Sequence, residues 1–250
     1  KDNDVNGNRS GQVRVFENKS DVWTQLGSDI NGDAEFNYLG FSVSLSGDGN
    51  TLAVSALGAT GIGVNQGLVR VYKNNSGNWT KIGADINGEA EFDRSGSSLD
   101  LSFDGNIIAI GAPTNDGNGE NSGHVRVFKN ESGLWEQIGQ DIDGEFVKEG
   151  LGQTLSLSSN GDIIVIGAPN NLRLNFSGSV KLFKYDNNNW NQVGNDIDGE
   201  ADYDFFGNTV SLSSDGSILA IGGAGNDNNG NSSGHVKLYD FSSVLSINVL

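Results

Sequence analysis

The stretch Trp135-Glu-Gln-Ile-Gly-Gln-Asp-Ile-Asp-Gly-Glu145 is the best guide to the fold, because similar stretches of this chain begin at three other tryptophans. These are Trp23, Trp79 and Trp190, so successive copies are 56, 56 and 55 residues apart. Each copy is preceded by the motif Gly-x-Val-[Arg/Lys]-[Val/Leu]-[Phe/Tyr]. It is followed by the motif [Ser/Thr]-[Leu/Val]-x-Leu-Ser and then by an apolar run. Such a period indicates a propeller, a solenoid or an array.

The repeats cover the chain without a linker. They start near residues 11, 67, 123, 178 and 234, and the fifth copy fades after Asp240. Glycine is frequent, with 37 residues, but it recurs with the repeat and therefore marks turns between strands. We expect residues 1–250 to form a single β-propeller domain or a fragment of a larger propeller.

One repeat is predicted to contain four strands, which we call A to D. The segment 97–102 alternates apolar and polar residues (A), and an Asp-Gly turn at 104–105 leads into the β-branched run 107–110 (B). After an Asn-, Asp- and Gly-rich loop, 124–128 alternates again (C), and 135–138 is the fourth strand (D). The chain is therefore expected to be all-β, with about 56 residues per four-stranded antiparallel blade.

Strand A is expected nearest the axis, because small serines flank its leucines. The tryptophans begin strand D and should pack between blades rather than stack on a ligand. Ring closure is open: strands at 208–223 could join those at 12–27 in a four-bladed ring, or the chain could be part of a larger propeller, which we favour.

Charge and composition exclude several classes of function. The net charge is −17, with 32 acidic and 15 basic residues, which argues against nucleic acid and anionic membranes. Cysteine is absent, so disulfide and thiolate chemistry are excluded.

Two short motifs carry a family resemblance. Phe206-Gly207, with Leu-Gly or Ser-Gly at 39–40, 95–96 and 151–152, precedes strand A, and Gly-Ala-Pro at 111–113 and 167–169 ends strand B. The chain resembles the FG-GAP repeats of integrin α-subunit propellers and of secreted bacterial surface proteins. The calcium loop of that family lies between these two motifs, where this chain has only a short hairpin, so that site does not carry over.

A second candidate cation site is read from the loops between strand D and the next strand A, the D–A loops. Each offers oxygen side chains at i, i+2 and i+4 with glycine at i+3, a spacing compatible with Ca²⁺. Alternatively, these side chains stabilise turns and pair with the bases that recur at one position of strand C, which we favour. The candidate ligands are Asp29, Asn31, Asp33, Asp85, Asn87, Glu89, Asp141, Asp143, Glu145, Asp196, Asp198 and Glu200.

No catalytic constellation can be assembled. His124 and His235 are equivalent residues of strand C, so we expect structural roles for both, and no Ser-His-Asp arrangement is evident. Carboxylates recur in every repeat, whereas one reaction needs one asymmetric set of groups. We therefore predict that the chain is not an enzyme.

The third loop between strands B and C breaks the repeat, because it is apolar and basic where its counterparts are Asn, Asp and Gly. With Phe146-Val147-Lys148-Glu149 it is predicted either to form an exposed contact site or to pack internally. The candidate ligand-binding residues are Leu172, Arg173, Leu174 and Phe176.

Together these features predict a non-enzymatic binding or adhesion module of an extracellular or bacterial cell-surface protein, with a protein or glycan partner. A structural spacer in a larger surface protein is the alternative, and a carbohydrate-active enzyme the weakest one. Segment 243–249 resembles the link into a C-terminal sorting domain of such proteins.

Overall fold

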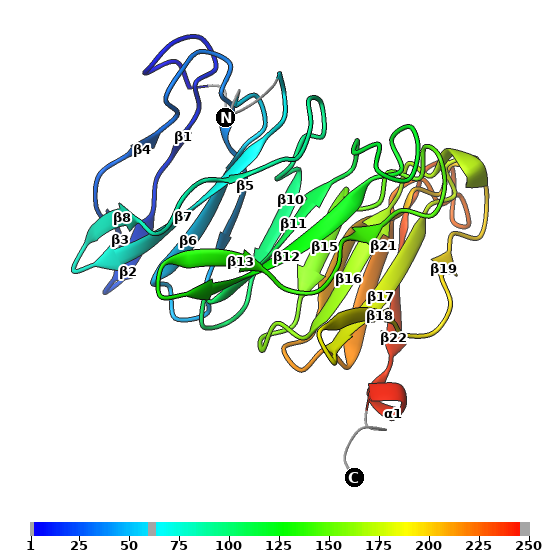
Figure 1. Ribbon diagram of the computed structural model, residues 1–250. Coiled ribbons are helices and arrows are strands. Elements are labelled where there is room, and N and C mark those ends of the chain that lie inside the picture. Colours follow the sequence, from blue (N-terminus) through cyan, green and yellow to red (C-terminus); the bar gives the residue numbers. More distant parts are fainter. Residues whose placement is uncertain (1–2, 60–63, 246–250) are drawn as a thin grey trace.

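The chain forms a row of antiparallel sheets that stand side by side, as blades of a β-propeller (Figure 1). The computed structural model describes residues 3–59 and 64–245. Most of segment 243–249 lies outside this part. None of the helices described is long and apolar enough to cross a membrane.

Three blades are complete, and each has the order A-B-C-D predicted from one repeat. In each, a fifth short strand pairs with the first half of strand C. The first consists of β5 (Leu39–Leu45), β6 (Thr51–Ala56), β7 (Leu68–Asn75), β8 (Asn78–Lys81) and β9 (Ile86–Asn87). The second consists of β10 (Ser98–Leu101), β11 (Ile107–Ala112), β12 (His124–Glu131), β13 (Leu134–Gln137) and β14 (Ile142–Asp143). The third consists of β15 (Thr154–Leu157), β16 (Ile163–Ala168), β17 (Ser179–Asp186), β18 (Asn189–Gln192) and β19 (Ile197–Asp198).

The two ends of the row are incomplete blades. At the start, β1 (Gln12–Val13) pairs with β4 (Ile30–Asn31), and β2 (Phe16–Lys19) pairs with β3 (Val22–Gln25). At the end, β20 (Phe206–Leu212), β21 (Ile218–Gly223) and β22 (His235–Asp240) form a three-stranded sheet, followed by the helical turn α1 (Ser242–Leu245).

The four-bladed alternative is wrong. It required the strands at 208–223 to join those at 12–27, but β21 pairs with β22 along its whole length. The fifth copy of strand C, β22, follows β21 in the chain and occupies this edge. The N-terminal strands and β22 lie at opposite ends of the row (Figure 1).

Strand A is innermost, as predicted, because β5, β10, β15 and β20 contact one another in sequence. Side chains bond each of these strands to the next. The Ser44 hydroxyl accepts from Leu101 N at 3.1 Å, and the Ser156 hydroxyl accepts from Leu212 N at 3.2 Å. In β10, Asp100 stands at the position that Ser44 and Ser156 occupy in the neighbouring blades, and its Oδ2 accepts from Leu157 N at 2.9 Å.

The predicted tight hairpins between strands A and B are confirmed. In the first, Asp48 Oδ1 accepts from the Ser46 hydroxyl at 2.7 Å and from Asn50 N at 2.9 Å. These hydrogen bonds lower the pKa of Asp48 to about 2. The carboxylate is therefore used to hold the turn.

The tryptophans pack between blades, as predicted, wherever a preceding blade exists. Each indole Nε1 donates to a carbonyl at the end of the preceding strand D, at 3.0 to 3.3 Å. Trp190 is 3% exposed, whereas Trp23, which has no repeat before it in this sequence, is 68% exposed. The donors and acceptors are Trp79 with Leu26, Trp135 with Ile82, and Trp190 with Ile138.

The D–A loops are shorter than the sequence predicts. Their second and third residues form β4, β9, β14 and β19, which pair with other strands. The isoleucine of each Asp-Ile-[Asn/Asp]-Gly explains the difference, because it enters the core between blades. Ile30, Ile86 and Ile142 are at most 9% exposed.

Candidate binding site

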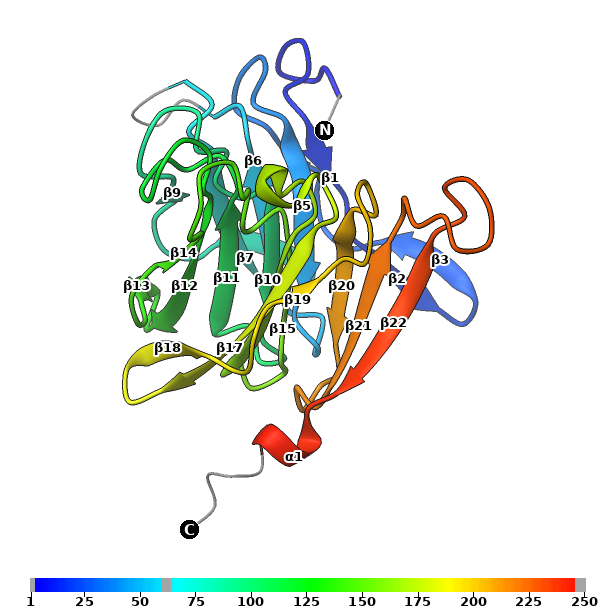
Figure 2. The same cartoon turned by 90° about the vertical axis from the view of Figure 1, so that its right-hand side faces the viewer.

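The D–A and B–C loops meet at one end of the row, the upper end in Figure 2. Backbone hydrogen bonds join each D–A loop to the B–C loop beside it. Tyr38 N donates to Arg9 O at 3.0 Å, and Arg94 N donates to Asn65 O at 3.2 Å. Gly150 N donates to the equivalent Asn121 O at 3.1 Å. The loops therefore form a platform whose backbone repeats from blade to blade while its side chains vary.

Several residues of this platform are held in the left-handed region. Arg9 has φ of 55°, Arg94 of 54° and Lys148 of 59°. Their counterparts in other repeats share this conformation, for example Tyr38 at 54° and Asn121 at 50°. Because the conformation belongs to the loop, these positions accept different side chains without altering the scaffold.

A depression of about 920 Å³ opens on this platform. Its volume is within the range of small-ligand sites, roughly 300–1,000 Å³. The apolar part of its wall includes Tyr38, Phe41 and Leu57, and the amides include Asn65 and Asn121. Every lining residue comes from a D–A loop, a B–C loop or an adjoining strand end. The end of the row that bears the D–A and B–C loops therefore carries a cavity.

The charges that line the depression are all basic. They are Arg9, Arg94 and Lys148, and none of the described lining residues is Asp or Glu. This composition is unusual in a chain with 32 acidic and 15 basic residues. The sequence prediction noted Lys148 but missed Arg9 and Arg94 as site residues, because they lie far apart in the sequence and in different loops.

The acids of the D–A loops do not line the depression, and several of them pair with the recurring bases of strand C. Arg70 Nη2 lies 3.0 Å from Asp85 Oδ2 and also bonds Asp33 of the preceding loop. Equivalent pairs join Arg14 to Asp29, Arg126 to Glu89, Lys181 to Glu145 and Asp196, and Lys237 to Glu200. All of these bases except Arg14 therefore reach an acid of the preceding repeat, in agreement with the ion-pair alternative for these loops.

The most deeply buried of these bases is Lys181, whose side chain is 1% exposed. Its Nζ lies 2.9 Å from Glu145, 3.2 Å from Glu149 and 3.3 Å from Asp196. Burial lowers the pKa of Lys181, but the hydrogen bond to Glu145 and the charges of Glu149 and Asp196 outweigh it, so the pKa is raised. This lysine therefore stays charged inside the protein.

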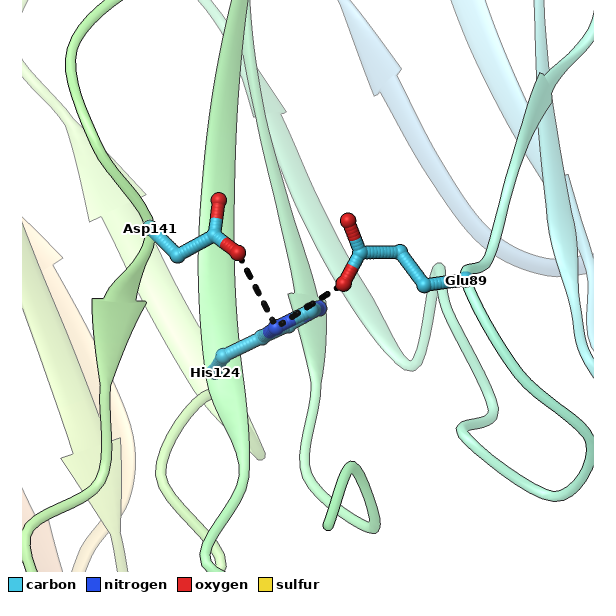
Figure 3. Close-up of side chains that lie close together, drawn as sticks. All are labelled: Glu89, His124 and Asp141. Atoms are coloured by element: carbon cyan, nitrogen blue, oxygen red, sulfur yellow. Dashed lines mark ion pairs between the residues drawn. The ribbon is translucent and has the colours of Figure 1, made fainter. Parts of the chain in front are cut away.

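Three possible metal ligands, Glu89, His124 and Asp141, converge outside the depression (Figure 3). The Nδ1 atom of His124 lies 3.9 Å from Glu89 Oε2 and 3.9 Å from Asp141 Oδ2. Burial, then the charge of Arg126, lowers the pKa of His124, so the ring is neutral at pH 7. One nitrogen and two carboxylates suit a transition ion better than Ca²⁺, although Zn²⁺ would require the ligands to draw together by about half an ångström.

The remaining predicted metal ligands do not converge within one loop. Among the described residues, Glu89, His124 and Asp141 are the single group of three or more His, Asp or Glu ligand atoms within 4.8 Å of one another. Asn31 accepts from Gln12 Nε2 at 2.8 Å. Burial and a neighbouring aspartate raise the pKa of Asp143 and of Asp198. The carboxylates that do converge, Glu89 and Asp141, therefore come from two successive D–A loops rather than from one.

The irregular loop at 171–176 contacts the segment at 146–149, which is the internal-packing alternative for this loop. Residues Leu172–Leu174 form a 3₁₀ turn, η1, in which Leu174 is half-buried. The guanidinium of Arg173 lies over the Phe146 ring at 3.7 Å, and Phe176 stacks on Tyr203 at 5.6 Å. Leu172 lines the depression. Only Leu172 of the four predicted ligand residues therefore belongs to the cavity.

Comparisons with known proteins assign no family to the chain. No family model matches the chain, and a search of the curated proteins finds no match. Among solved structures, the chain is similar to a "putative TolB" from Agrobacterium tumefaciens, with 12% identity and a TM-score of 0.49. The match covers 85% of this chain and 61% of that one, so the chain spans about three fifths of its length.

Proposed function

We propose that this chain is a non-enzymatic binding module of an extracellular or bacterial cell-surface protein, and that its ligand is bound in the depression on the loop-bearing end. The carrying observation is the asymmetry of that cavity. The blades repeat, but the cavity wall does not, since Arg9, Arg94 and Lys148 have no basic counterparts in the other repeats. An asymmetric wall on a repeating scaffold suits recognition of one defined ligand.

The distribution of carboxylates favours binding over catalysis. The acids of the D–A loops recur from blade to blade and pair with bases. The described residues that line the cavity include no carboxylate that could serve as a general acid or base. The resemblance of the repeats to FG-GAP propellers supports a place at the cell surface and a protein or glycan partner.

A glycan array and a panel of extracellular matrix proteins test the proposal. We expect the purified chain to bind at least one of them, and we expect Asn121→Trp, which fills the cavity wall, to abolish that binding without lowering the melting temperature. Binding that is unaffected by Asn121→Trp would place the ligand elsewhere. Failure of the chain to bind any probe would favour the structural spacer.

A further inference from the structure

The chemistry of the cavity wall narrows the ligand class. Resting on the binding function proposed above, we propose that the depression binds an acidic oligosaccharide, whose carboxylates are held by Arg94 and Lys148. Arginine pairs with planar carboxylates in bidentate geometry, and lysine adds a point charge.

Comparison of the repeats shows that these cations are not part of the scaffold. The position of Arg9 holds Asn65 and Asn121 in the next two repeats, and that of Arg94 holds Tyr38 and Gly150. The position of Lys148 is aromatic in the other three repeats: Phe36, Phe92 and Tyr203. The bases required by the repeat occupy a different position, in strand C, and are engaged in ion pairs. Three cations that depart from the repeat and line one cavity indicate a binding site.

Two of the cations are available to a ligand. Arg94 is exposed, and within residues 3–59 and 64–245 its guanidinium forms no ion pair. Lys148 Nζ lies 3.4 Å from Glu120, but both side chains are exposed, at 43% and 63%. Exposed pairs of this kind contribute only about 0–1 kcal/mol, so a ligand carboxylate can displace Glu120.

The other wall residues favour a sugar over an acidic peptide. Asn65 and Asn121 present amides, which can both donate to and accept from hydroxyl groups. Tyr38 and Phe41 provide rings on which the face of a sugar can lie. The backbone hydrogen bonds that join the loops hold these groups in place before the ligand arrives, which lowers the entropy lost on binding.

The net charge of the chain affects how an acidic sugar would bind. An anionic ligand approaches a protein of net charge −17, so long-range repulsion opposes association and salt relieves it. Short-range pairing inside the cavity is weakened by salt. Because the repulsion disfavours the acidic sugar relative to its neutral form, any preference for the acid must come from its contacts with Arg94 and Lys148 in the cavity.

The test is calorimetric titration with a galacturonic acid tetramer and with its fully methyl-esterified form, which keeps the ring hydroxyls and removes the charges. We expect the acid form to bind at least tenfold more tightly. Arg94→Gln and Lys148→Gln should each weaken its binding about tenfold, as expected for loss of one charge-assisted contact. Lys129→Gln removes the same charge from an exposed residue of β12 that does not line the cavity, and should bind like the wild type.

The outcomes separate this proposal from the broader one. Equal binding of the acid and esterified tetramers, or full binding by both glutamine variants, would overturn the acidic class while leaving a binding module. A sulfated tetramer that binds in place of the uronate, and is lost in Arg94→Gln, would keep the anionic sugar and change its acidic group. Binding of poly-glutamate but of no acidic sugar would refute the glycan assignment.

Discussion

The indole of Trp190 lies against Gly139, a residue of the preceding repeat, at a place where any larger side chain would clash. A Cβ built on Gly139 would be 2.7 Å from Trp190 Cδ1, and the indole Nε1 donates to the adjacent Ile138 carbonyl at 3.1 Å. Gly27 with Trp79 and Gly83 with Trp135 repeat this relationship. The glycine of Trp-x-x-[Leu/Ile/Val]-Gly is thus the receptor for the tryptophan of the next blade.

Truncation of the buried tryptophan should be far more damaging than truncation of the exposed one. Trp190→Ala is expected to lower the free energy of unfolding by about 3–5 kcal/mol, the range for large aromatic residues in a core. Trp135 is only half-buried, so Trp135→Ala should fall at the lower end of that range. Trp23→Ala is the control and should leave the melting curve nearly unchanged. Equal effects of Trp190→Ala and Trp23→Ala in chemical denaturation would contradict packing between blades.

The receptor glycine can be tested separately from its tryptophan. Gly139→Ala introduces a side chain at φ of 73° and against Trp190, whereas Gly194→Ala does so at φ of 74° with no atom within 4 Å. Both variants should lose about 1–2 kcal/mol from the left-handed backbone. Gly139→Ala should lose more, because the indole must also move. Identical stabilities of the two variants would mean that the contact carries no energy.

The buried lysine differs sharply from its counterpart in the last blade. Lys181→Met leaves Glu149, which is 1% exposed, without its cation, and should destabilise the protein by about 3–5 kcal/mol. Lys237 is 32% exposed and pairs with Glu200 at the surface, so Lys237→Met should change stability by about 0–1 kcal/mol. Thermal melts of both variants measure the difference. A double variant, Lys181→Met with Glu149→Gln, removes the unpaired charge but keeps an acceptor for the N–H groups of Glu145 and Phe146, and it should recover stability if the unpaired carboxylate is the cause.

Asp100 makes stability depend on pH. Burial raises its pKa, although hydrogen bonds from Leu157, Ser44 and Leu101 oppose the shift. Because the folded pKa lies above the unfolded value of about 3.9, this group favours the folded state at low pH, and its contribution is lost as pH rises through the folded pKa. Asp100→Ser restores the residue found at the same place in the other repeats and keeps an acceptor for Leu157 N. It should therefore gain stability over the wild type as pH rises from 4 to 7 in parallel denaturation curves. A variant that is less stable at both pH values would show that the carboxylate is needed as a bridge.

The blades could be predicted from the repeat because the patterns that specify them involve residues close together in the sequence. Alternating strands, Asp-Gly hairpins and equally spaced tryptophans each follow from neighbouring residues, and the structure confirms them. The short strands at Ile86 and Ile142 are not predictable from the sequence, because two residues are too few to show alternation. The cavity was not predictable in full, because Arg9 and Arg94 meet only after the row of blades forms. When the repeats are aligned with one another, each of these arginines is the only cation at its position, and this is the signal that could have found them.

The acids of the D–A loops leave one prediction that concerns metal. Because Asp85, Glu145 and Asp196 are paired with Arg70 or Lys181, we expect excess Ca²⁺ to leave the melting temperature close to its value in chelator. A calcium site saturated at 100 times its dissociation constant would add about 2.7 kcal/mol, which is a shift of several degrees for a domain of this size. Such a shift would assign the loops as metal sites. Asp141→Asn would then show whether the ion lies beside His124, since the substitution would remove the shift there and Asp29→Asn would not.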